Sequence, residues 1–119
     1  MTFEAILNEL VNRVEGALGA MFLDWEGEAV QIVGRSASAY DLQLAGAYQG
    51  IYLDRLRKIG TSCDLGQPQS FRIRLEGSTF LNAVLKDGYY LVLVLRTGAP
   101  EGVAWERLRR TRERLIREI

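Results

Sequence analysis

Two segments of this chain, residues 17–23 and 89–96, are apolar on both faces of an extended strand. Successive side chains of a strand point to opposite sides, so such a segment needs apolar cover above and below. Each segment is far shorter than the ~20 residues of a membrane span. We therefore expect two central strands in one sheet with helices on both of its faces.

Three segments have the periodicity of helices. Apolar residues at positions 3, 6, 7, 10, 11 and 14 form one helical stripe, with Thr2 as the expected cap and Gly16 at its end. A second helix is predicted over residues 40–59, closed by Gly60, with Ser36 and Ser38 as possible caps. A last helix follows the Pro100 loop to the end of the chain, and four of its apolar side chains are expected to face inward: Trp105, Leu108, Leu115 and Ile119.

The remaining strands follow from turn and alternation signals. A turn at residues 24–27 leads into a strand at 28–33, and Asp87-Gly88 predicts a hairpin between strands at 79–86 and 89–96. Residues 70–76 alternate, with Phe71, Ile73 and Leu75 expected on a buried face.

The predicted order of elements is α-β-β-α-β-β-β-α, in one domain over residues 1–119. With the two fully apolar strands as neighbours, the spatial strand order is 2-1-5-4-3 in a mostly antiparallel sheet. The second and third strands are then the edges. The fold class is an α/β (α+β) sandwich.

Composition excludes several kinds of chemistry. The 119 residues contain no histidine and a single cysteine, Cys63, so the chain cannot build a Ser-His-Asp or Cys-His system or an ordinary zinc site. It has neither a P-loop motif nor a Gly-x-Gly-x-x-Gly motif. We predict that it is not an enzyme and has no catalytic residue, cofactor or metal.

Charge and hydropathy limit the partners. Fifteen basic and fifteen acidic residues cancel, which predicts no general attraction to nucleic acid. The first ten residues include Glu4 and Glu9, unlike a signal peptide, and with the free cysteine we expect a cytoplasmic location without membrane insertion.

A basic ridge lies on the last helix at Arg107, Arg110, Arg114 and Arg117. It could recognise an acidic partner. We favour a solvated face, because Glu106 and Glu113 are each spaced for an ion pair four residues further on.

The second helix and third strand carry more apolar surface than one chain uses. Strand 70–76 would be an unpaired edge without proline, which favours antiparallel pairing with a second copy. Alternatively, Tyr48, Ile51 and Tyr52 simply pack on their own sheet. The predicted dimer interface comprises Gly46, Gly50, Ile51, Phe71, Arg72, Ile73 and Arg74, the two glycines allowing close approach of another backbone.

Three segments resemble the Roadblock (dynein light chain) family, including its MglB-like members. They are Ile-Leu-Asn-Glu-Leu-Val at 6–11, Val-Glu-Gly-Ala-Leu-Gly-Ala-Met-Phe-Leu-Asp at 14–24 with Gly27, and Gly-Tyr-Tyr-Leu-Val-Leu-Val-Leu at 88–95. The resemblance covers essentially the whole chain. It implies a profilin- or longin-like sandwich and a homodimer joined at the third strand and second helix.

The resemblance also implies a non-catalytic regulator or scaffold that binds a Ras-like small GTPase. In MglB-like members the paired second helices bind the GTPase, and by position this face would include Tyr48, Gln49, Tyr52, Arg55 and Arg57. No arginine can be nominated as an arginine finger.

Two alternatives remain open. The first is a PAS- or GAF-like small-molecule sensor, for which Asn82 is the main polar group on the central strands. The second is a purely structural dimerisation module. This sequence does not indicate which GTPase would bind, or whether binding would stimulate hydrolysis, stimulate exchange or only provide a scaffold. These points depend on the sequence of the partner.

Overall fold

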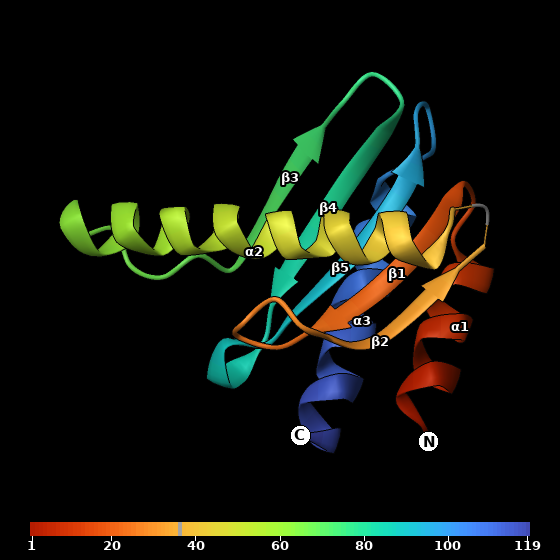
Figure 1. The fold of residues 1–119 in the computed structure, drawn as a ribbon, viewed down its shortest axis with the longest axis horizontal. Helices are drawn as coiled ribbons and strands as arrows, with labels where there is room; N and C mark the ends of the chain where they lie inside the picture. The colour runs from red at the N-terminus through yellow and green to blue at the C-terminus, as the bar shows by residue number, and fades with distance from the viewer. Residues whose placement is uncertain (36) are drawn as a thin grey trace.

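The computed structural model describes residues 1–35 and 37–119 and shows three helices on a five-stranded sheet (Figure 1). The strand order β2-β1-β5-β4-β3 and the antiparallel pairing of all four described strand pairs confirm the predicted topology. The elements are α1 (Phe3–Arg13), β1 (Ala17–Leu23), β2 (Ala29–Gly34), α2 (Ala39–Ser62), β3 (Ser70–Arg74), β4 (Ser78–Val84), the short 3-10 helix η1 (Lys86–Gly88), β5 (Tyr90–Arg96) and α3 (Gly102–Glu118).

Strands β1 and β5 form the centre of the sheet, as their apolar sequences predict. Helices α1 and α3 pack on one face of the sheet, and α2 crosses the other face (Figure 1). Leu93 is buried on the α1–α3 side and Val92 on the α2 side, so neighbouring residues of β5 serve two separate cores. This double burial is why the strand has no polar face.

Local signals in the sequence determine where α1 begins and where the chain turns between β4 and β5. The Thr2 hydroxyl accepts a hydrogen bond from Ala5 N at 3.1 Å and caps α1. Asp87 and Gly88 have φ values of 57° and 83°, the left-handed pair that a tight two-residue hairpin requires.

Helix α2 is longer at both ends than the sequence predicts. Ser38 caps its start by accepting from Asp41 N at 3.1 Å, whereas Ser36 lies outside the described residues. At the other end the helix continues past Gly60 to Ser62, and the Gly66 carbonyl packs where a side chain on Gly60 would stand. The glycine therefore allows close packing of the following loop instead of ending the helix.

Strand β3 is shorter than predicted. The chain leaves the strand at Arg74 and reverses, with Leu75 N donating to Ser78 O at 2.8 Å. Leu75 is 54% exposed, so its predicted place on the buried face is wrong.

The helices were also compared with the length and hydropathy that a membrane span requires. None of those in the described part of the chain meets both requirements.

Candidate protein-interaction surface

One face of α2 carries a row of large apolar side chains that the chain itself leaves uncovered. We call this row, together with Arg55, the α2 stripe. Its apolar members are between 42% and 73% exposed, at about the spacing of successive helical turns: Tyr40, Leu44, Tyr48, Ile51, Tyr52 and Ile59. A contiguous row of exposed apolar side chains is typical of protein-interaction sites, so the stripe is the candidate interaction surface of this chain.

The stripe is exposed because α2 packs on the sheet by its opposite face. Leu42 and Leu53, three helical turns apart, are 3% and 1% exposed and join the core above β1 and β5. The helix is also longer than the sheet is wide, and its C-terminal part projects beyond β3 (Figure 1). The alternative that Tyr48, Ile51 and Tyr52 pack on their own sheet is therefore wrong.

Tyr40, Leu44 and Ile59 belong to the stripe although they were not among the residues predicted for a dimer or GTPase contact. Tyr40 is 73% exposed and precedes Leu44 by four residues. The four-residue spacing could have placed Tyr40 on the same helix face as Leu44. The prediction missed it because Tyr40 was the first residue of the predicted helix, where the direction of a side chain is not yet determined.

Strand β3 lies at the edge of the sheet beside α2. Among the described residues it pairs only with β4, in unbroken register from Ser70 opposite Ala83 to Arg74 opposite Thr79. Phe71 is half-buried on the α2 side. A regular, bulge-free edge of this kind is competent to pair with another strand.

The arginines of β3 lie on the opposite side of the sheet from Phe71. Arg72 donates two hydrogen bonds to the Glu101 carboxylate, at 2.6 and 2.8 Å, and this guanidinium lowers the pKa of the Glu101 carboxyl. Arg74 is exposed. Arg72 is thus held by its own chain at the start of α3.

Gly46 and Gly50 face the sheet of their own chain. A Cβ on Gly46 would lie 2.8 Å from Met21 Sδ, and one on Gly50 would lie 2.5 Å from Tyr90 Oη. Their small size is explained within one protomer, in contrast to the predicted role in contact with a second backbone. Both glycines therefore contact the sheet of their own chain and leave no surface for a second one.

The five residues predicted to face a GTPase divide into three groups. Tyr48, Tyr52 and Arg55 are exposed on the α2 stripe. Arg57 lies on the flank of the helix, toward the β4–β5 turn. Gln49 is only 3% exposed, which contradicts its prediction as a surface contact.

Gln49 is instead one half of a buried amide pair. Its Oε1 accepts a hydrogen bond from Asn82 Nδ2 at 2.9 Å, while Asn82 Oδ1 has no hydrogen-bond partner. Asn82, the polar group that a sensor domain would use, is fully buried and already engaged by α2. The sequence signal that could have predicted this pair is a polar residue on the inward face of α2, Gln49, and another on a central part of the sheet, Asn82 of β4.

Two of the four arginines of the α3 ridge form ion pairs among the described residues. Arg110 contacts Glu106 at 3.0 Å, as their spacing predicts. Arg114 reaches across to Glu9 of α1 at 2.8 Å and lowers the pKa of that carboxyl. The pair expected between residues 113 and 117 does not form.

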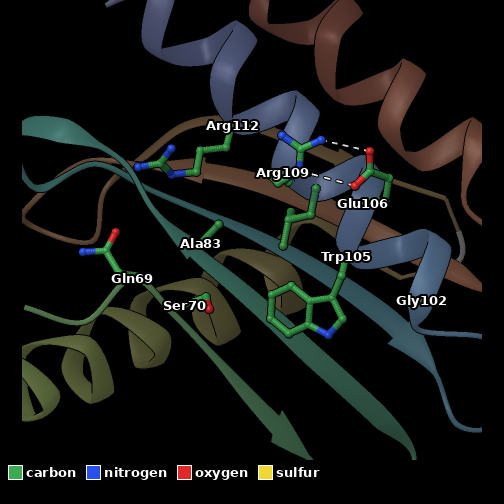
Figure 2. A pocket seen from close by; sticks show the side chains of 9 residues that line it. Gln69, Ser70, Ala83, Gly102, Trp105, Glu106, Arg109 and Arg112 are labelled. Carbon is green, nitrogen blue, oxygen red and sulfur yellow. Dashed lines mark hydrogen bonds and ion pairs between the residues drawn. The ribbon is translucent and has the colours of Figure 1, made fainter.

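A groove of about 450 Å³ runs between α3 and the β3–β4 edge (Figure 2). Trp105 and Leu108 supply apolar walls, and the Arg109 guanidinium is held at the rim by Glu106. The described residues contain no group of three or more His, Cys, Asp or Glu side chains placed to hold a metal ion. The groove therefore offers contact surface without a set of metal ligands.

Comparison with known proteins identifies the class of fold. Neither the family models nor the curated proteins give a match to this sequence. Among solved structures, a Roadblock/LC7 domain from Streptomyces avermitilis superimposes with a TM-score of 0.87 at 16% identity, covering 97% of this chain and 95% of that one.

The MglB and MglC proteins share the same architecture. An MglB with a tetrameric arrangement matches with a TM-score of 0.85 at 18% identity, over 95% of this chain and 84% of its own. MglC from Myxococcus xanthus matches over the full length of both chains at 27% identity, with a TM-score of 0.71. The protein has the Roadblock/LC7 fold, and the predicted resemblance to Roadblock and MglB-like proteins is confirmed.

Proposed function

We propose that this protein is a non-catalytic, homodimeric regulator or scaffold that binds a Ras-like small GTPase and modulates its nucleotide cycle. The single observation that carries the proposal is the α2 stripe, an uncovered row of large apolar side chains on one helix. The stripe gives the chain a contact surface, and the predicted family resemblance gives that surface a partner.

The dimer is the first part of the proposal. Antiparallel pairing of two β3 edges would join two sheets into one and bring two α2 helices side by side. Ile51, Phe71 and Ile73 would lie within this interface, with Arg72 and Arg74 on the opposite side of the paired edge. The tetrameric MglB, which shares the fold, supports self-association.

The GTPase surface is the second part. Tyr48, Tyr52 and Arg55 are exposed on the α2 stripe. In the dimer, the copies of these side chains on the two paired helices would form one surface that stays open to a GTPase. Aromatic and arginine side chains are typical anchors of protein interfaces. Arg57 would extend this surface at its flank. The regulator would act by contact, holding the switch segments of the GTPase in place.

The experiment is a pull-down of small GTPases from the source lysate with tagged protein, with GDP and with a non-hydrolysable GTP analogue in parallel. Recovery mainly with the GTP analogue supports a regulator that recognises the active state, and equal recovery supports a scaffold. Tyr52→Ala combined with Arg55→Ala should abolish recovery while the protein remains a dimer.

A matched control uses exposed residues on the other side of the sheet. Val103→Ala combined with Arg110→Ala removes an exposed apolar side chain and an arginine from α3 and should leave recovery unchanged. If neither nucleotide state recovers a GTPase, the regulator proposal fails and the protein is better interpreted as a structural dimerisation module.

A further inference from the structure

A second candidate site lies away from the α2 stripe, in a hollow of about 320 Å³. Four elements meet there: the C-terminal half of α2, the α2–β3 loop, the β4–β5 turn and α3. The polar side chains that line the hollow are Arg57, Gln67, Gln69, Lys86 and Arg112, and no lining residue is acidic. Three cations from three elements thus surround one space.

These three cations are not neutralised by the protein. Among the described residues, Arg57, Lys86 and Arg112 have no carboxylate oxygen within 4.0 Å. Asp54, which lines a neighbouring hollow together with Arg57, is engaged by Lys58 at 3.6 Å. Like charges around a small hollow repel each other, and a bound anion would remove that repulsion.

Arg112 is held in position for such an anion. Its Nε donates to Val84 O at 2.6 Å, which fixes the half-buried guanidinium and leaves its terminal amino groups without a described protein partner. In Figure 2 the Arg112 side chain extends away from the Glu106–Arg109 pair toward the end of the sheet where Gln69 lies. A preorganised guanidinium loses little entropy when it binds an anion.

We propose that this hollow binds the phosphate group of a small soluble compound. Two guanidinium groups can each offer paired N–H donors to the oxygens of a phosphate, Lys86 adds a point charge, and Gln67 and Gln69 supply amide donors. The volume is at the lower limit of small-molecule sites, about 300 Å³, which suits a phosphate with a small substituent. Arg57 is shared with the flank of the proposed GTPase surface, whereas Gln67, Gln69, Lys86 and Arg112 are not part of that surface.

The test is a titration of the isotopically labelled protein with inorganic pyrophosphate, followed by amide NMR at constant ionic strength. We expect saturable shifts at Gln67, Gln69 and Lys86. Arg57→Gln, Lys86→Gln and Arg112→Gln should each weaken binding about tenfold, because each removes a charge-assisted contact.

The matched control is Arg117→Gln, on the same helix as Arg112 and outside the hollow. It makes the same change in net charge and should alter the affinity less than about twofold, because its side chain does not line the hollow and an exposed charge is screened by salt. Arg57→Gln and Lys86→Gln act at the rim of the hollow, so the test does not depend on whether Arg112→Gln folds.

Three outcomes would overturn the proposal. One is the absence of saturable shifts, and another is equal weakening by Arg117→Gln, which would indicate diffuse charge attraction. The third comes from a parallel sedimentation assay with phosphatidylcholine vesicles containing phosphatidic acid. Binding to these vesicles without binding to pyrophosphate would identify a lipid headgroup as the phosphate source.

Discussion

At the scale of single residues, the buried Gln49–Asn82 pair is the least expected feature. One hydrogen bond of 2.9 Å joins the two amides, and Asn82 Oδ1 is left unsatisfied. Among the described residues Gln49 is the only hydrogen-bond partner of the Asn82 side chain, so Gln49→Ala should lower the free energy of unfolding by about 1–3 kcal/mol. Urea denaturation at a fixed protein concentration measures this loss.

The double variant Gln49→Leu with Asn82→Leu is the informative comparison. It replaces both amides with apolar groups of similar size, so no buried polar atom remains unpaired, and its stability should return to within about 1 kcal/mol of the parent. If the loss in the free energy of unfolding of the double variant equals the sum of the losses of the two single variants, the amides contribute through other contacts.

Tyr90 gives a prediction at high pH. Burial, and then the charge of Asp24, raises the pKa of the Tyr90 hydroxyl to about 12, and this hydroxyl donates to Gly46 O at 2.9 Å. The unfolded chain releases the proton near pH 10, whereas the folded chain retains it up to about pH 12. The contribution of Tyr90 to stability is therefore complete below pH 10 and is lost between about pH 10 and 12.

The measurement is urea unfolding of the parent and of Tyr90→Phe near neutral pH and at about pH 11. Near neutrality Tyr90→Phe should be about 1 kcal/mol less stable, because the hydrogen bond to Gly46 is lost. At about pH 11 the difference should shrink by about 1 kcal/mol. An equal difference at both pH values would mean that Tyr90 titrates alike in the folded and unfolded chains.

At the scale of elements, the sequence predicts the strands well because their signals are local. The alternation of β3 and the Asp87-Gly88 turn are read from neighbouring residues, and they place the hairpins correctly. The role of Gly46 and Gly50 in α2 could not be predicted from neighbouring residues. Whether Gly46 faces its own sheet or another chain depends on Met21, Leu23 and Tyr90, which are distant in sequence.

This distinction makes opposite predictions for Gly46→Ala and Gly50→Ala. If the glycines faced solvent, alanine would stabilise the helix by about 1 kcal/mol. Because a Cβ would meet Met21 or Tyr90 at 2.8 Å or less, we expect a loss of about 1–3 kcal/mol in the free energy of unfolding. Chemical denaturation and sedimentation equilibrium should show lower stability with an unchanged dimer dissociation constant.

A stabilised alanine variant, or one that changes only the dissociation constant, would contradict this. A stabilised variant would show that the glycine faces solvent, whereas a change in the dissociation constant alone would return the two glycines to the interface predicted from the sequence. The contacts with Tyr90 make Gly50→Ala the more sensitive variant, since the tyrosine is already fixed by its bond to Gly46.

At the scale of the whole molecule, the exposed surface follows from a mismatch between α2 and the sheet. The 24-residue helix crosses a sheet only five strands wide, buries one face, and leaves the α2 stripe beside the unpaired β3 edge. The sequence indicated the surplus of apolar residues on α2. It could not assign Gln49 to the core, because the inward face depends on how the helix is rotated against the sheet.

The proposed dimer can be tested without disturbing the fold of one protomer. Ile51 is 50% exposed, so Ile51→Glu places a charge at the surface of a single chain but inside the paired helices of a dimer, where an unpaired charge is costly. We expect a folded monomer by circular dichroism and an at least about tenfold weaker association by sedimentation equilibrium. Val103→Glu, at a side chain 59% exposed on α3, should remain dimeric. A dimeric Ile51→Glu would place the interface elsewhere, because a buried carboxylate between two apolar helices should not be tolerated.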